Sequence, residues 1–404
     1  MTDLGTRPTT VAVVGAGGFA GFILDAVRDV PEAHVAAVVD IDRTRARELA
    51  ARHGARELSW NEALADPAVD AVVIASPPGT HSALAIEAIG AGKDVFCEKP
   101  VGTTPSEALA VRNHAAKHDR VVVVDHVLRY NPLLRGLRRL QDHLDWRPVR
   151  FLFENDAADE SLPADHWFWN EAQSGGIFVE HGVHFFDAAA IFVDERATHV
   201  DATSTRREGW PSPDIVTASL VHGDCLVTHT HSFTHAHRAE RQLMRLDYGV
   251  AEARVNGWIP VSADIDVFTD DAGLDQLLAL VSTPDFLGPT RDGFSPSATV
   301  SVDASRHDGT AFGRGRPFPA SRRARVAMSL GGAPAKSAVY HATVADAIRD
   351  LHACRLDRTR RPISGPDTAA TAVAVAYAAA QADRTGHRVR LDPLPPLPPL
   401  PSND

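Results

Sequence analysis

Cysteine is scarce in this chain: its 404 residues contain only Cys97, Cys225 and Cys354. These residues lie far apart and form no C-x-x-C pair, so neither a disulfide framework nor a cysteine-rich zinc site is indicated. Such usage is typical of a protein whose thiols stay reduced. Cys97 stands in an apolar run, which predicts a small buried side chain.

Long apolar runs and an excess of positive charge are also missing. No run approaches the roughly 18 residues that cross a bilayer. The residues before Thr10 lack the charged start and apolar core of a secretory signal. We therefore expect a cytoplasmic protein that does not bind membranes. The formal net charge of -11 argues against nucleic acid as a partner, because nucleic-acid binders present a basic face.

The first part of the chain alternates strand and helix signals. Near-continuous β-branched runs predict strands buried on both faces, over residues 11–14, 35–39, 71–74, 94–97 and 121–124. Helices are predicted between them, over 18–29, 42–53, 80–91 and 104–118. This repeat predicts an α/β domain over residues 1–127, a doubly wound parallel sheet of the Rossmann type.

The remaining residues have a different character, and the chain is too long for one hydrophobic core. Strands predicted over 148–157, 197–206, 214–221, 225–234 and 241–256 suggest a mostly antiparallel, open β-sheet. Helices are predicted over 131–144, 338–354 and 367–384, a loop and then a helix over 175–193, and a long loop over 282–325. We therefore expect an α+β domain at 128–391, for substrate binding and oligomerisation, and a disordered proline-rich tail at 392–404.

A glycine-rich turn follows the first predicted strand and opens the first helix. It matches G-x-G-x-x-(G/A) with Gly15, Ala16, Gly17, Gly18, Phe19 and Ala20. Gly15 permits a tight turn, Gly17 lets a pyrophosphate approach the backbone, and the amino end of the helix favours phosphate. The turn therefore predicts a dinucleotide site.

An acidic residue ends the second strand. Asp40 lies 20 residues after Ala20, where a carboxylate accepts hydrogen bonds from ribose hydroxyls and repels a 2′-phosphate. This favours NAD as the cofactor, with Ile41 beside it, while Arg43 and Arg45 leave NADP open.

Two more predicted strands are followed by residues with functional side chains. Ligands bind at the carboxyl ends of parallel strands. Ser76, Pro77, Pro78 and His81 follow the third strand, and Glu98, Lys99 and Pro100 follow the fourth. We place both groups beside the cofactor.

Three motifs follow one another along the chain: GAGGFA, SPPGTHSALAIEAIGAGKDVFCEKP and, at 174–187, SGGIFVEHGVHFFD. Over residues 10–392 the chain resembles the glucose-fructose oxidoreductase / inositol dehydrogenase / rhizopine-catabolism (Gfo/Idh/MocA) family.

The resemblance implies a catalytic pair. In that family the lysine of E-K-P and the histidine of a later D-x-G-x-H motif flank the substrate carbon, which places Lys99 and His184 in these roles. The Lys-Pro bond is commonly cis, so Pro100 would shape the turn that presents the lysine. Glu180 stands where the family has an aspartate, and its longer side chain leaves open whether it touches the substrate or His184.

The residue types suit the oxidation of an alcohol. An imidazole with a near-neutral pKa can accept the hydroxyl proton, and a lysine cation stabilises the developing alkoxide. We assign these roles to His184 and Lys99, with an exchange of roles left open, and Glu180 would orient the imidazole.

Other residues are assigned to the substrate pocket: Arg129, Trp167, Trp169, His181 and His235. The two tryptophans suit stacking on a sugar ring, but core packing explains them equally well. His81 stands either near the nicotinamide or simply at a helix start. Asn131, in a segment that resembles the family's hinge, either lines the pocket or, in the favoured interpretation, caps a helix.

Four histidines share one parity around the strand predicted over 225–234: His229, His231, His235 and His237. They would project from a single face, and imidazoles can bind metal. However, no cysteine or acidic pair accompanies them at ligand spacing. We therefore predict no metal and favour pocket or interface histidines.

Together these features predict NAD(P)-dependent hydride transfer between nicotinamide and a secondary alcohol or ketone of a sugar, amino sugar or cyclitol. Two alternatives remain: an enzyme that keeps and recycles its NAD, as in sugar–sugar redox or glycosidase chemistry, and a non-catalytic NAD-sensing regulator. The resemblance also implies a homodimer or homotetramer formed through the C-terminal sheet.

Overall fold

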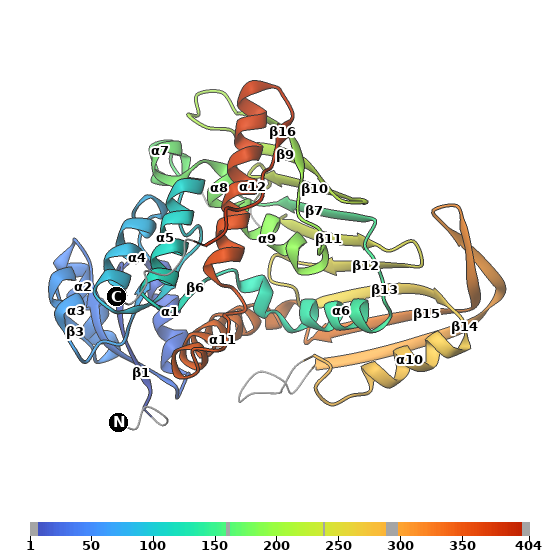
Figure 1. The fold of residues 1–404 in the computed structure, drawn as a ribbon, viewed down its shortest axis with the longest axis horizontal. Coiled ribbons are helices and arrows are strands. Elements are labelled where there is room, and N and C mark those ends of the chain that lie inside the picture. The colour runs from blue at the N-terminus through green and yellow to red at the C-terminus, as the bar shows by residue number, and fades with distance from the viewer. Residues whose placement is uncertain (1–6, 159–161, 237–238, 288–297, 398–404) are drawn as a thin grey trace.

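The computed structural model describes residues 7–158, 162–236, 239–287 and 298–397. Within these ranges the chain forms two β-sheets, one in each half of an elongated molecule (Figure 1). The predicted fold class is confirmed: a parallel doubly wound sheet is followed by a larger, mostly antiparallel one.

The first sheet has strand order β3-β2-β1-β4-β5-β6, and all its pairings are parallel. Its strands are β1 (Thr9–Val14), β2 (Ala33–Val39), β3 (Arg56–Glu57), β4 (Ala71–Ile74), β5 (Asp94–Cys97) and β6 (Val122–Val124). The helices of this half are α1 (Gly18–Arg28), α2 (Arg43–His53), α3 (Trp60–Ala65), α4 (His81–Gly90) and α5 (Pro105–Lys117). β4 and β5 are buried at every position, as strands covered on both faces should be.

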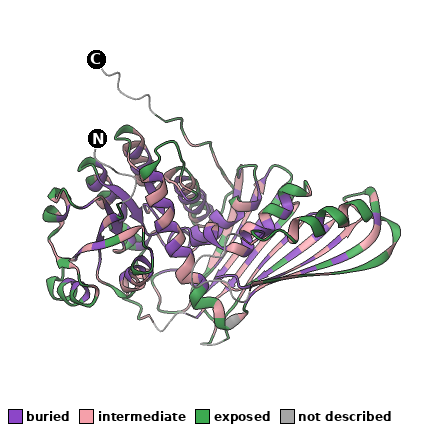
Figure 2. Cartoon of the chain, turned by 90° about the horizontal axis from the view of Figure 1, so that it is seen from below, coloured by how far each residue is buried: buried purple, intermediate pink, exposed green. Residues whose placement is uncertain are grey.

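The second sheet has strand order β14-β15-β13-β12-β11-β7-β10-β9-β8-β16, and only β7 and β10 pair in parallel. Its strands are β7 (Arg150–Asp156), β8 (His199–Thr205), β9 (Ile215–His222), β10 (Cys225–Ser232), β11 (Arg241–Asp247), β12 (Ala251–Asn256), β13 (Ser262–Thr269), β14 (Ala298–Gly313), β15 (Arg316–Leu330) and β16 (Val389–Arg390). Burial alternates along most of them, so one face packs inward while the other stays more open (Figure 2).

Further helices accompany this sheet. They are α6 (Pro132–His143), α7 (Glu171–Ser174), α8 (Ile177–Glu180), α9 (Val183–Phe192), α10 (Asp271–Val281), α11 (Lys336–Leu356) and α12 (Pro366–Thr385), with short 3-10 turns η1 (Pro78–Thr80), η2 (Val127–Tyr130), η3 (Trp167–Trp169) and η4 (Ala333–Ala335). Asn131 caps α6 by accepting from the backbone N–H groups of Leu133 and Leu134, which confirms the favoured interpretation.

The segment over 282–325 was wrongly predicted as a long loop. Within the described part it holds β14 and most of β15, a long antiparallel hairpin at the end of the sheet. Serines, glycines and arginines line these strands because much of the hairpin is exposed, and an exposed ribbon lacks the apolar alternation that marks a strand. The strand predicted over 241–256 is likewise two strands, β11 and β12, which form a hairpin.

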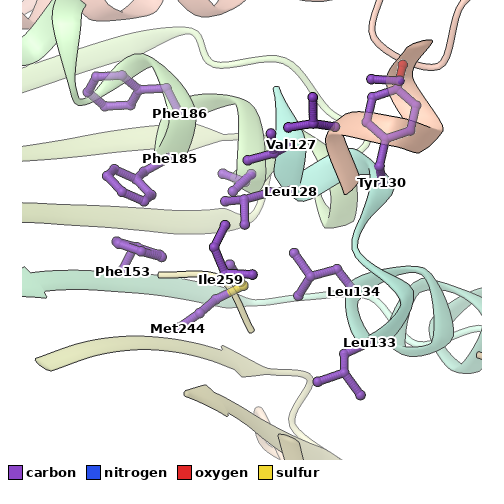
Figure 3. Packing of buried hydrophobic residues seen from close by; sticks show 14 of the residues in the cluster. Val127, Leu128, Tyr130, Leu133, Leu134, Phe153, Phe185, Phe186, Met244 and Ile259 are labelled. Carbon is purple, nitrogen blue, oxygen red and sulfur yellow. The ribbon is translucent and has the colours of Figure 1, made fainter. Parts of the chain in front are cut away.

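The two halves share a core at their junction. η2 continues from β6, and its Val127 and Leu128 lie close to Ile259 and to Phe185 of α9 (Figure 3). The C-terminal helices also return to the first half: α11 packs on α1, β5 and β6, and α12 packs on α5. The boundary at residue 127 therefore stays a prediction, since elements from both sides of it build one continuous core.

The proline-rich tail is described as far as residue 397. Arg112 of α5 donates a 2.8 Å hydrogen bond to the carbonyl oxygen of Pro395, so this part of the predicted disordered tail lies against the first half. Residues 398–404 are outside the described residues.

Candidate active site

The glycine-rich turn joins β1 to α1. Gly15 has a φ of +104°, and a Cβ added there would lie 2.5 Å from the carbonyl oxygen of Ala75, so both conformation and space require glycine. A Cβ on Gly17 or Gly18 would meet nothing within 4 Å. α1 begins at Gly18 without a side-chain cap, which leaves its first N–H groups free to bind an anion. This turn therefore fits a pyrophosphate.

Asp40 stands at the end of β2 beside the same turn. One carboxylate oxygen accepts from the N–H of Ala16 at 2.7 Å, and the other from the N–H of Asp42 at 2.7 Å. Asp40 therefore holds the glycine-rich turn directly. Arg43, which left NADP open in the sequence, pairs with Glu57 at 2.6 Å, and Ile41 is fully exposed.

His81 connects two of the predicted loops. Its ring nitrogens lie 2.7 Å from the carbonyl oxygens of Pro100 and Ser76, and the side chain is buried. Burial lowers the pKa of His81, while the two carbonyls oppose that shift. Both ring nitrogens are engaged by backbone, so His81 holds the loops after β4 and β5 together. Pro78 is also buried, whereas Pro77 is exposed and Ser76 bonds Thr80 at 2.7 Å.

Lys99 and Glu180 meet across the two halves of the molecule. The Lys99 ammonium donates to the Glu180 carboxylate at 2.7 Å and to its backbone carbonyl at 2.8 Å, and both side chains are about nine-tenths buried. The Lys99-Pro100 bond is cis, as the family resemblance implied. The printed contact of the Glu180 carboxylate is with the lysine, and its role in orienting His184 stays a prediction.

His184 lies on α9, four residues after Glu180, which ends α8. Its ring stands 4.7 Å from that of Trp258 and 6.2 Å from that of His126, measured between centroids. Burial, and then the positive charge of Lys99, lower its pKa well below the usual value. A neutral imidazole beside a lysine cation is therefore the resting arrangement, and a neutral imidazole can accept a proton.

A second buried pair lies at the same sheet edge. Glu98 and Asp125 follow the adjacent strands β5 and β6, and their side chains share a hydrogen bond. Burial and mutual repulsion raise the pKa of Glu98 well above its usual value, and burial raises the pKa of Asp125 to about 6. Two neighbouring buried carboxyls favour the state in which one of them is protonated. Asp125 was missed in the sequence, although its place after a buried strand was the signal that singled out Lys99.

The remaining predicted residues lie around this centre. The Nε–H of Arg129 donates a bifurcated hydrogen bond to the two carboxylate oxygens of the buried Asp187 of α9, at 2.7 and 3.0 Å. His181 lies 2.8 Å from the side-chain nitrogen of Asn155, and burial lowers its pKa to about 3. Trp258, missed in the sequence, has no local motif, because it stands in the turn between β12 and β13.

Trp169 is buried among aromatic rings, 5.0 Å from Trp210 and 5.9 Å from Phe233, which favours the packing interpretation. Trp167 is half-buried at the start of η3.

The strand predicted over 225–234 is shorter in the structure, because β10 ends at Ser232. His235 therefore lies beyond the strand, with its Nε2 3.9 Å from a carboxylate oxygen of Asp156. His237 is outside the described residues.

Comparison with protein families agrees with this geometry. Residues 9–126 match the model described as oxidoreductase family, NAD-binding Rossmann fold, and residues 145–248 match that of the GFO/IDH/MocA C-terminal domain. The two regions together span more than half of the chain. The chain belongs to the Gfo/Idh/MocA family. Residues 9–126 are thus an NAD-binding Rossmann domain, as the glycine-rich turn and Asp40 had indicated.

Individual relatives of this Gfo/Idh/MocA protein include dehydrogenases of cyclitols. Inositol 2-dehydrogenase 1 of Saccharopolyspora erythraea is 37% identical over 202 residues, which cover 48% of this chain and 58% of the relative. The scyllo-inositol 2-dehydrogenase (NAD(+)) of Bacillus subtilis is 28% identical over 193 residues, covering 47% and 55%. The chain thus matches somewhat under two thirds of the length of these curated relatives.

Among solved structures, an NAD binding oxidoreductase from Klebsiella pneumoniae superposes with a TM-score of 0.72, at 19% identity, over 96% of this chain and all of the other. The shared fold therefore extends beyond the regions of detectable sequence identity. Within the described residues no helix is long and apolar enough to cross a membrane.

Proposed function

We propose that this protein oxidises a secondary alcohol of a cyclitol or sugar with NAD, and catalyses the reverse reduction. The observation that carries the proposal is the buried Lys99–Glu180 pair beside His184, at the sheet edge that also presents the glycine-rich turn. Bound NAD supplies the hydride acceptor. The similarity to inositol dehydrogenases supports a polyol as the other reactant.

The roles of the residues follow from their charges. His184, neutral at rest, accepts the hydroxyl proton of the substrate. The ammonium of Lys99 stabilises the oxygen as negative charge develops on it, since such a charge in a buried site needs a nearby donor. Glu180 fixes the position of Lys99 through two short contacts and keeps the pair near neutrality.

The cofactor preference is for NAD over NADP. Asp40 puts a carboxylate beside the turn, where a 2′-phosphate would be repelled. Arg43 is already paired with Glu57, and Arg45 pairs with Asp42 at 3.3 Å, so both cations have local carboxylate partners.

A panel of inositols, sugars, amino sugars and sugar phosphates, with NADH absorbance as the signal, tests the proposal. We expect at least one polyol to reduce NAD, and Lys99→Met to abolish the signal while NAD still binds. NAD retained through purification, without net NADH release, would instead favour internal recycling. Binding of a sugar without redox change would favour a regulator.

We also propose self-association through the open face of the second sheet. In β9 and β13 the residues that do not face the helices are mostly half-buried rather than fully exposed, which suits a surface covered by a second copy. Light scattering after gel filtration should give a dimer or tetramer, and a monomer at high concentration would refute this proposal.

A further inference from the structure

Two half-buried aromatic side chains lie beside the candidate active site, and neither was predicted from the sequence. Trp258 stands in the turn between β12 and β13, and Tyr340 lies near the start of α11. The centroids of their rings are 6.2 Å apart, and the ring planes are nearly perpendicular. The second sheet and a C-terminal helix therefore bring two aromatic rings into contact at this place.

The two rings span the distance from the cofactor turn to the candidate proton acceptor. The ring of Tyr340 lies 6.1 Å from that of Phe19 in the glycine-rich turn and 4.8 Å from that of Phe22 on α1. The ring of Trp258 lies 4.7 Å from that of His184. The reacting carbon of a substrate has to approach both the nicotinamide and His184, because its hydride and its hydroxyl proton leave for these two groups. Trp258 and Tyr340 therefore border the space in which that carbon binds.

Core packing alone does not account for these two side chains. Tyr130, which does fill the core, is 1% exposed, and its hydroxyl donates a hydrogen bond to Asp350. Trp258 and Tyr340 are only half-buried. Among the described residues, no hydrogen bond involves the indole N–H of Trp258 or the hydroxyl of Tyr340. Because the polar tips of packed aromatic residues usually find a partner, these two donors are available to a ligand.

The turn that carries Trp258 is fixed on both sides of the ring. Gly257 has a φ of +94°, which favours glycine, and its N–H donates to the carbonyl oxygen of Gln242 at 3.0 Å. The side chain of Asn131, which also caps α6, donates a 2.9 Å hydrogen bond to the carbonyl oxygen of Pro260. The ring is thus held in place before a ligand arrives, as the wall of a binding site should be.

We propose that Trp258 and Tyr340 form an aromatic wall of the substrate site, which selects ring-shaped polyols over open chains. The proposal rests on the proposed function. A cyclitol or pyranose ring gathers C–H groups on its faces and hydroxyl groups at its rim. The wall would bury one such apolar face, while the indole N–H and the phenol O–H donate to hydroxyl groups at the rim.

An open-chain polyol fits this wall less well for an entropic reason. Its carbon chain rotates freely and presents no fixed apolar face. It would lose that rotational freedom on binding, whereas a ring is already rigid. The wall therefore discriminates by shape, and the discrimination should appear mainly in substrate binding.

The first test compares two polyols of matched composition. Myo-inositol and D-sorbitol have the same number of carbon atoms and of hydroxyl groups, but only myo-inositol is a ring. We measure kcat and KM with NAD for both, and for any other ring polyol that gives a larger NADH signal. The natural protein should have the higher kcat/KM for a ring. Equal values for ring and open chain would overturn the aromatic wall and leave the proposed function intact.

The second test alters the wall. In Trp258→Ala, KM for the ring polyol should rise about tenfold with little change in kcat, because the lost contact is made to bound substrate before and during the reaction. Trp258→Phe keeps an aromatic ring and should recover most of the affinity. Tyr340→Phe removes only a donor, so KM should rise about threefold. An unchanged KM for the ring polyol in folded Trp258→Ala would overturn the proposal.

Trp60 provides the matched control. It is also half-buried, but its indole N–H donates to Glu87 within the first half of the chain. Trp60→Ala should therefore leave KM for the ring polyol and for NAD unchanged.

A binding measurement without turnover completes the test. The NADH-loaded enzyme cannot oxidise a polyol, so addition of the ring polyol, beginning with myo-inositol, reports binding alone. Tryptophan fluorescence should change in the natural protein and in Trp60→Phe, and this change should be lost in Trp258→Phe. A change of equal size in folded Trp258→Phe would place the polyol away from this ring and overturn the proposal. Failure of the natural protein to reduce NAD with any polyol would overturn the proposed function as well.

Discussion

The ammonium of Lys99 lies 2.7 Å from the carboxylate of Glu180, and the two residues come from different halves of the molecule. Lys99 follows β5 of the parallel sheet, whereas Glu180 ends α8 beside the second sheet. This contact therefore completes the candidate site only when the halves pack together. The glutamate side chain, one methylene longer than the aspartate that the family resemblance implied, reaches the lysine directly.

Glu180→Gln should lower both stability and turnover. It leaves a buried lysine without its counter-ion, which costs about 3 kcal/mol in unfolding free energy. Denaturant unfolding and NADH assays provide the measurements, and Glu48→Gln on the exposed face of α2 is the matched control. Unchanged turnover in Glu180→Gln would show that the ion pair is dispensable.

His184→Asn should lower kcat by about 10²–10⁴-fold, the usual contribution of a positioned proton acceptor. NAD affinity should stay the same, because this residue lies in the second half of the chain. Turnover and NAD titration are measured on the same preparation. An effect confined to a higher KM, with kcat unchanged, would mean that His184 binds substrate without accepting its proton.

Two glycines of the same turn should respond in opposite ways. Gly15→Ala brings a Cβ to 2.5 Å from the Ala75 carbonyl oxygen at a φ of +104°, so we expect a loss of about 3 kcal/mol in stability. Gly17→Ala meets no protein atom within 4 Å and should fold normally. It should nevertheless weaken NAD binding by about tenfold, or 1.4 kcal/mol, if the pyrophosphate occupies that space. Thermal melts with and without NAD distinguish the two effects.

Asp40→Ala should shift cofactor use toward NADP, because the substitution removes the carboxylate that repels a 2′-phosphate. We expect the ratio of kcat/KM for NAD to that for NADP to fall by about tenfold, equivalent to one lost interaction of 1.4 kcal/mol. Asp270→Ala is the control: it removes the cap of α10 in the second half of the molecule, which costs about 1 kcal/mol in stability, but leaves the ratio unchanged. An unchanged ratio in Asp40→Ala would assign cofactor choice to other residues.

The buried Asp125 makes stability depend on pH. Its pKa rises from 3.8 to about 6 on folding, so the folded state binds its proton more tightly than the unfolded state does. The stability that this proton provides is fully present below pH 3.8 and is lost as pH rises to about 6. Asp125→Asn keeps the neutral form at every pH. The variant should therefore gain stability relative to the natural protein as pH rises through this window, as thermal melts would measure. A difference that does not change with pH would contradict the buried pair.

Much of the first half was readable from the sequence. β4 and β5 are buried on both faces, so their apolar runs are nearly continuous, and α5 carries a complete capping box at Thr104. The glycine-rich turn was readable for the same reason: the close approach of Gly15 to Ala75 is a local requirement that only glycine meets. The hairpin of β14 and β15 could not be recognised, because its exposed residues carry no alternation.

The sequence by itself thus determined the Rossmann half and the cofactor turn, since each depends on neighbouring residues and on backbone geometry, and its motifs pointed to Lys99 and His184 as the candidate catalytic pair. Only the tertiary structure decided which partner each side chain has. Glu180 bonds Lys99 rather than His184, His81 ties two loops together, and Asp125 meets Glu98. His231 of β10 lies beside His181 and Phe185, in the interior between the sheet and α9. Such contacts depend on how the two sheets and the helices between them pack. The local sequence does not encode which side chains that packing brings together.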